Sequence, residues 1–251
     1  KFWLEEFAGD MPVLNLPVDF SRPAVQSFAG DSRVFEIESG QANVLNELAL
    51  KNETTLFMVL LTIYNIFLFK LSSREDIVVG TPIAGRNHAE LGSVIGMFVN
   101  TLALRNYPTG EKTFLTFLEE VKENALQVFE NREYPFEELV ETVSVNRDAG
   151  RNPVFDVVFA LQNFQARTDT IPEVDIEELK FKPFKKERKT AKFDMNMMAV
   201  EKGDSISFIF EYSTRLFREE TIDRFIRYFK ELVSHVIEMP GLEISDIDII
   251  P

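Results

Sequence analysis

The sequence contains no cysteine among its 251 residues. Disulfide bonds, thiolate nucleophiles and cysteine-ligated zinc or iron–sulfur centres are therefore excluded. The absence of cysteine suits a reducing compartment, and we expect a cytoplasmic protein. Histidine is almost as scarce, with two residues, and neither an HExxH pair nor any other metal-ligand spacing occurs. The sequence thus predicts no metal site.

Positive charge is also in short supply, with 27 lysines and arginines against 41 acidic residues and a net charge of -14. Affinity for nucleic acid and for anionic membrane surfaces comes largely from basic residues, so we expect neither partner. The longest apolar run extends only from Leu56 to Phe69 and includes Thr62, Tyr64 and Asn65. A membrane-spanning helix needs about 20 apolar residues, so this run predicts a buried helix of the core.

Apolar periodicity predicts one α/β domain (an α+β sandwich) in which a mixed sheet is covered by helices. Residues 1–32 contain Pro12, Pro17 and Pro23, which favours an extended segment on a surface, and residues 243–251 are interpreted as a tail that leaves the domain. The predicted helices cover residues 41–51, 54–72, 113–130 and 218–238, with a short one at Pro135, and the predicted strands cover residues 33–39, 77–81, 95–105, 154–163, 176–182, 193–201 and 204–212.

A search for a self-contained active site is mostly negative. His88 lies in a predicted loop, residues 82–93, but no serine near it occupies a recognisable nucleophile turn. His235 follows Glu231 by four residues on the last predicted helix, which is typical of a solvated helix residue with an i,i+4 partner. Residue chemistry alone therefore indicates a non-catalytic α/β domain.

The stretch IGMFVNTLALR carries Asn100 and Arg105 within an otherwise apolar, strand-like segment. A buried amide costs up to a few kcal/mol unless it is hydrogen-bonded, so Asn100 must have partners. Two interpretations stay open: Asn100 ties the strand to a neighbouring loop, or it lines a tunnel and contacts an extended, amide-bearing ligand. Arg105 is interpreted as a strand-end ion pair.

Three motifs resemble those of condensation domains in nonribosomal peptide synthetases. VIGMFVNTLALR (residues 94–105) resembles the family's IGxFVNT…R motif. NREYPFEEL (residues 131–139) resembles the next motif, with Arg132 and Glu133 in place of its Gln and Asp. RDAGRNPVF (residues 147–155) resembles R-D-x-S-R-N-P-L, with Gly150 in place of Ser. DIVVGTPIAGRNHAEL, FDVVFALQN and AKFDMNM follow the family's order, so the resemblance covers essentially the whole chain.

The resemblance implies a lobe with the chloramphenicol-acetyltransferase-like fold and a role in peptide-bond formation between peptidyl and aminoacyl groups carried as phosphopantetheine thioesters. The family's catalytic HHxxxDG motif is missing, because the chain has no adjacent histidines. The chain therefore resembles the C-terminal lobe alone, with residues 1–32 as an inter-lobe linker, residues 33–242 as the lobe, and residues 243–251 as the start of a linker toward an adenylation domain. We expect such a lobe to be inactive alone and to bind no cofactor directly.

The implied partners are the missing N-terminal lobe, the upstream and downstream peptidyl carrier proteins and the adjacent adenylation domain, and the isolated lobe is expected to self-associate through the apolar surface that faced its partner. The loop from Gly80 to Arg86 could reach toward the other lobe. The basic stretch from Lys180 to Lys192 is interpreted as a solvated hairpin, or else as a contact for an acidic carrier protein. A non-catalytic interaction or carrier-docking module and an epimerization-type relative remain alternatives.

The resemblance also assigns candidate site residues. It places Met97, Asn100 and Thr101 as candidate walls of the substrate tunnel. A structural role within these motifs is implied for Arg105, Pro135, Phe136, Arg147, Asp148, Arg151 and Asn152.

Overall fold

The computed structural model describes residues 1–86, 89–143, 148–162 and 189–250. The predicted strand at 176–182, most of the basic stretch, His88 and Arg147 lie outside the described residues.

The described strands form one six-stranded mixed sheet in the order β1-β6-β5-β4-β2-β3. Strand β4 runs parallel to its neighbours β2 and β5, and the remaining pairs are antiparallel. The mixed sheet predicted from the sequence is therefore confirmed. The strands are β1 (Gly30–Ile37), β2 (Ile77–Ala84), β3 (Val99–Asn106), β4 (Val157–Gln162), β5 (Met195–Lys202) and β6 (Ser205–Ser213).

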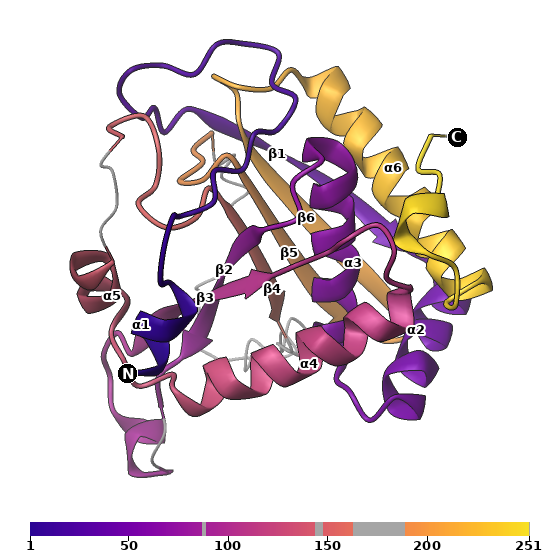
Figure 1. Ribbon diagram of the computed structural model, residues 1–251, viewed down its shortest axis with the longest axis horizontal. Coiled ribbons are helices and arrows are strands. Elements are labelled where there is room, and N and C mark those ends of the chain that lie inside the picture. Colours follow the sequence, from indigo (N-terminus) through magenta and orange to yellow (C-terminus); the bar gives the residue numbers. More distant parts are fainter. Residues whose placement is uncertain (87–88, 144–147, 163–188, 251) are drawn as a thin grey trace, which may run out of the picture.

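Four helices, α2, α3, α4 and α6, pack together on one face of this sheet (Figure 1). All the long predicted helices are confirmed to within two residues at their starts. Threonine side chains cap the N-termini of two of these helices: Thr55 caps α3 and Thr113 caps α4. The helices are α1 (Phe2–Glu6), α2 (Ser39–Lys51), α3 (Leu56–Ser72), α4 (Phe114–Glu130), α5 (Phe136–Thr142) and α6 (Glu219–Glu238), with 3-10 turns η1 (Ala89–Ser93) and η2 (Ile244–Asp246).

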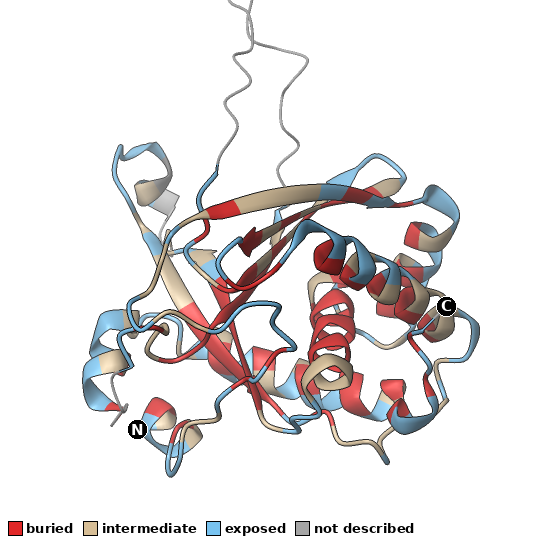
Figure 2. Ribbon diagram, turned by 90° about the horizontal axis from the view of Figure 1, so that it is seen from above, coloured by how far each residue is buried: buried red, intermediate tan, exposed pale blue. Residues whose placement is uncertain are grey.

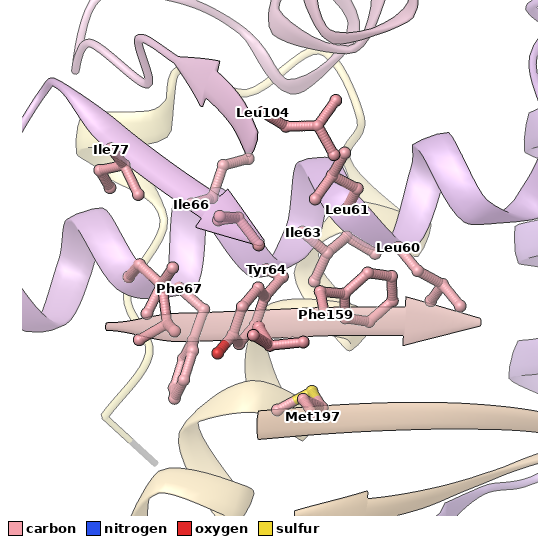
Figure 3. Close-up of a cluster of buried hydrophobic side chains, with 14 of the residues drawn as sticks. Leu60, Leu61, Ile63, Tyr64, Ile66, Phe67, Ile77, Leu104, Phe159 and Met197 are labelled. Atoms are coloured by element: carbon pink, nitrogen blue, oxygen red, sulfur yellow. The ribbon is translucent and has the colours of Figure 1, made fainter. Parts of the chain in front are cut away.

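Helix α3 forms the centre of the core. Its residues from Met58 to Leu68 are all buried, and Tyr64 and Phe67 pack among side chains of the sheet (Figure 3). No single helix in the described part of the chain is long and apolar enough to cross a membrane. Helices α2 and α3 meet that test only as a pair, and the pair is bent by 107°. The apolar run is thus accounted for by burial in the core.

In the described part of the chain, the opposite face of the sheet carries no helix layer (Figures 1 and 2). Near β2 the aromatic ring of Phe155 lies against it, so close to Gly80 that an added Cβ would be 2.2 Å from the ring. Farther along, cross-strand pairing places Val34, Ile209 and Met198 in one row over β1, β6 and β5. Val34 is 69% exposed, and the other two are half-buried. The described structure therefore leaves an apolar row of its sheet open.

Two sequence predictions are wrong in detail. The predicted strand at 95–105 begins only at Val99, because the ladder between β2 and β3 ends at the pair Ala84–Val99 and no neighbouring strand pairs with residues 95–98. The predicted tail does not leave the domain at residue 243. Ile244, Ile247 and Ile249 are buried, and burial of these apolar side chains holds the segment on the lobe.

A substitution of Phe229 in α6 tests whether the assigned aromatic core stabilises the fold. The ring of Phe229 contacts Phe35, Phe67 and Phe208, which come from a second helix and two strands. Phe229→Ala is expected to lower the free energy of unfolding by about 3–5 kcal/mol, because it removes apolar contacts and leaves a cavity. Urea unfolding would measure this. The control Leu50→Ala, at a 78% exposed position, should change it by less than about 0.5 kcal/mol. Equal losses would contradict the assigned core.

Candidate functional site

An arm projects from the sheet where β2 and β3 are joined. We use "arm" for residues 85–98, of which 87 and 88 are not described. The peptide N–H of Gly85 donates to the carbonyl of Phe98 at 2.6 Å and closes the base of the arm. Within it Ile95 is 101% exposed and Met97 is 92% exposed. Two fully solvated large apolar side chains so close together are typical of a contact surface.

Asn100 lies at the foot of the arm, and its side chain makes four hydrogen bonds. The amide nitrogen donates to the carbonyls of Arg132 (2.9 Å) and Tyr134 (3.0 Å). The amide oxygen accepts from the peptide N–H groups of Thr101 (2.8 Å) and Phe136 (3.2 Å). Both donors and both acceptor positions of the amide are thus engaged. Asn100 ties the start of β3 to the loop that leads into α5.

This tie joins two of the motifs. Pro135 precedes the first residue of α5 in extended conformation, and Phe136 opens the helix with its ring 5.3 Å from that of Phe155. Phe155 in turn covers Gly80. A line of contacts therefore runs from Asn100 through Phe136 to the open face of the sheet. Met97 lies in the arm and Thr101 on β3, so the three tunnel candidates belong to one edge of the lobe.

Arg105 forms the ion pair that the sequence predicts. Its guanidinium, 8% exposed, binds the carboxylate of Asp76 through two hydrogen bonds of 2.9 and 2.7 Å. It also donates to the carbonyls of Glu6 (3.0 Å) and Asp10 (3.4 Å). The hydrogen bonds with Asp76 raise the pKa of Arg105, and burial raises the pKa of the Glu6 carboxyl. Arg105 thereby anchors the N-terminal segment to the sheet edge.

The loop at residues 148–153 is held from within the lobe. Arg151 pairs with Asp156 and approaches the carbonyl of Leu14 at 3.4 Å. Asp148 accepts from the peptide N–H of Gly150 at 2.8 Å, and Asn152 donates to the carbonyl of Lys192 at 3.2 Å. These contacts agree with a structural role.

A second arginine, Arg22, locks the N-terminal segment to the same loop. It binds the carboxylate of Asp194 through both terminal nitrogens and donates to the carbonyl of Gly150. A Cβ on Gly150 would be 2.5 Å from the carbonyl oxygen of Pro23, so a side chain at this position would require the N-terminal segment to shift. Burial, reinforced by the charge of Asp194, raises the pKa of Asp156. This paired network could not be predicted from the sequence, because Arg22 lies far from its partners along the chain.

A cavity of about 520 Å³ opens between the N-terminal segment and this loop. It is lined by both apolar and acidic side chains, including Asp10, Asp76, Asp148 and Asp156. Over the described ranges, no group of three or more acidic or histidine residues could hold a metal ion. His235 lies on α6, where its Nδ1 bonds to the carbonyl of Glu231 at 3.0 Å, in agreement with the predicted helix-surface role.

Comparison with known proteins places this geometry in context. A family model described as "Condensation domain" matches residues 1–251. Surfactin synthase subunit 1 of Bacillus subtilis (strain 168) is 48% identical over 250 residues, which are 100% of this chain and 7% of that protein.

Solved structures share the fold. The four-domain nonribosomal peptide synthetase holo-AB3403, bound to AMP and glycine, matches with a TM-score of 0.90 and 25% identity over 100% of this chain and 20% of its own. The condensation domain from the Monacolin K polyketide synthase MokA matches with a TM-score of 0.80 and 17% identity, over 97% of this chain and 57% of its own.

Arg151→Met tests the buried pairing. Because Asp156 has a raised pKa, it contributes stability that is present below the ordinary aspartate pKa of about 3.9 and is lost as the pH rises through the raised value. Removing Arg151 raises that pKa further. We expect a loss of about 3 kcal/mol at pH 7 and a clearly smaller loss at pH 4, measured by urea unfolding. The control Arg215→Met, at an exposed position, should change the free energy of unfolding little at either pH. If Arg151→Met loses the same free energy of unfolding at both pH values, its pairing with Asp156 is not the cause of the loss.

Asn100→Ala tests the tie between the motifs. It leaves two carbonyls and two peptide N–H groups without their side-chain partner, so we expect a loss of about 1–3 kcal/mol in the free energy of unfolding and faster amide exchange at Phe136. Asn46→Ala is the matched control, because that amide makes one bond to Ala42 within its own helix. A loss no greater than that of the control would show that the tie contributes nothing to stability.

Proposed function

The chain belongs to the condensation-domain family, and we propose that it is the C-terminal lobe of such a domain in a cytoplasmic nonribosomal peptide synthetase. In this proposal the lobe supplies one wall of the site in which a peptide bond forms, and the isolated lobe is inactive. The lobe binds no cofactor of its own, and its substrates arrive on the phosphopantetheine arms of carrier proteins.

The coverage of solved structures carries the proposal of a half-domain. The match covers 97% of this chain, yet it spans just over half of the chain that holds the MokA condensation domain. The described residues form one sheet with the four long helices, α2, α3, α4 and α6, on a single face. A second lobe would account for the remaining length and would have an open sheet face and an arm to contact.

The arm and the apolar row supply the contact surface for that lobe. Ile95 and Met97 present apolar side chains to solvent beside the β3 edge of the sheet, and Val34 does so at the β1 edge. Covering such side chains contributes about 1.5–3 kcal/mol each relative to exposure. The same surface would lead the isolated chain to self-associate when the first lobe is absent.

Chemistry at this site would require little of the present lobe beyond positioning. The amine of an aminoacyl group attacks the carbonyl carbon of a peptidyl thioester, the new C–N bond forms, and the carrier thiol leaves. Holding the two thioesters in register is the main contribution, because an amine is already nucleophilic. The base or orienting group would come from the first lobe. Met97, Asn100 and Thr101 form the proposed wall, with Asn100 fixing its shape through backbone hydrogen bonds.

The ends of the chain fit the same proposal. The N-terminal segment, held by Arg105 and Arg22, would receive the chain from the first lobe. The segment after η2 would lead toward an adenylation domain, and it starts from an anchored position, because Lys70 donates to the carbonyl of Ser245 at 3.0 Å. Domains on either side, together with upstream and downstream carrier proteins, are the proposed partners.

A complementation assay tests the function. The chain is mixed with loaded donor and acceptor carrier proteins, with and without a separately expressed first lobe of the same synthetase, and mass spectrometry reads the dipeptidyl thioester on the acceptor. We expect product only when both lobes are present. Product from this chain alone would contradict the half-domain proposal, and binding of the first lobe without product would favour a non-catalytic docking module.

A variant pair checks that the arm mediates this assembly. Replacing Ile95 and Met97 together by serine should weaken binding of the first lobe at least about tenfold, measured by titration, because two apolar side chains lose their cover. Leu50→Ser is the control, since Leu50 is exposed on α2, in the helix layer. An equal effect of both changes would argue against the arm as the contact.

A further inference from the structure

The described residues of the arm, 85–86 and 89–98, have a defined arrangement although little regular structure supports it. Beyond the pair Ala84–Val99 the described residues contain one 3-10 turn, Ala89–Ser93, and no strand pairing. A long connection of this kind normally explores many conformations, and ordering it costs conformational entropy. A specific set of contacts must therefore keep Ile95 and Met97 in their observed positions.

Arg86 supplies those contacts. Its guanidinium donates to three backbone carbonyls of the returning half of the arm, those of Leu91, Val94 (2.9 Å) and Gly96 (3.3 Å). Its Cζ atom also lies 4.4 Å from the centre of the Phe98 ring. The side chain of Arg86, which follows the end of β2, thus contacts four residues of the part of the arm that leads to β3.

The chemistry of the guanidinium fits this task. It offers five N–H donors in a planar fork and can stack on an aromatic ring at the same time, whereas an ammonium is a compact point charge. The residue before it is also fixed, since a Cβ on Gly85 would be 2.3 Å from the carbonyl oxygen of Phe98. Only glycine allows the two sides of the arm to approach closely enough for Arg86 to reach across.

We propose that Arg86 is a positioning residue that pre-forms the arm, so that Ile95 and Met97 are presented to the first lobe in a binding-competent arrangement. The inference rests on the proposed function. Arg86 acts within the arm and not on the partner, since its hydrogen bonds go to the arm's own backbone. Pre-organisation of this kind raises affinity by lowering the entropic cost of association.

Binding kinetics separate positioning from direct contact. The chain and its variants are passed over immobilised first lobe, and association and dissociation rate constants are measured. Arg86→Ala should reduce the association rate constant about tenfold with less than about a twofold change in dissociation, because fewer arms are pre-formed. Ile95→Ser should mainly speed dissociation. Arg86→Lys should behave like Arg86→Ala; if lysine restores the rate, charge attraction and not shape is responsible, and the proposal fails.

Hydrogen exchange gives a readout that does not depend on the proposed function. The peptide N–H groups of Gly85 and Val94 are bonded to the carbonyls of Phe98 and Leu91. In Arg86→Ala and Arg86→Lys these amides should lose about tenfold in protection, while amides of the core helix α3 keep theirs. Arg215→Ala serves as the control. If the arm amides of the Arg86 variants keep their protection, the inference is wrong even when the wild-type chain binds the first lobe. If those amides lose protection but the wild-type chain does not bind the first lobe, the proposed function alone is rejected.

Discussion

Burial of helix α3 is the constraint around which the lobe is built. A helix that is apolar on all sides must be surrounded, and here the sheet covers one side while α2, α4 and α6 cover the others. The helix layer is committed to enclosing α3, so all four helices lie on the same face of the sheet. The other face is left to loops, to the N-terminal segment and to whatever partner is brought against it.

Polar side chains then fix the segments that the core does not hold. Arg22, Asn100, Arg105 and Arg151 each bind backbone carbonyls of a segment remote from them along the chain. Apolar contacts are non-directional, whereas hydrogen bonds to a buried or half-buried fork or amide specify one arrangement. Of these four, Asn100 and Arg105 stand out in the sequence because they interrupt an apolar run.

Most of the fold could be predicted from the sequence, because periodicity reports which faces are buried. The apolar run of α3 and the wide apolar stripe of α6 gave both helices, and alternation gave β6. The arm and the folded-back tail could not be predicted, since Ile95 and Ile244 look alike in the sequence and only the surrounding structure decides which one is covered. The interrupted apolar run identified Asn100, but three of its four hydrogen-bond partners lie in the segment that leads into α5 and carry no periodic signal.

The sheet also has a seam. Strands β2 and β4 share one ladder position, Gly80 opposite Val158, whereas β2 and β3 are paired along their whole length. The β2–β3 hairpin therefore shares little backbone pairing with the rest of the sheet. Its strands are held instead by side chains packed against α3 and α4. The helix layer thus sets the position of the sheet edge that carries the arm, so that a change in the packing of α3 or α4 would reach Ile95 and Met97.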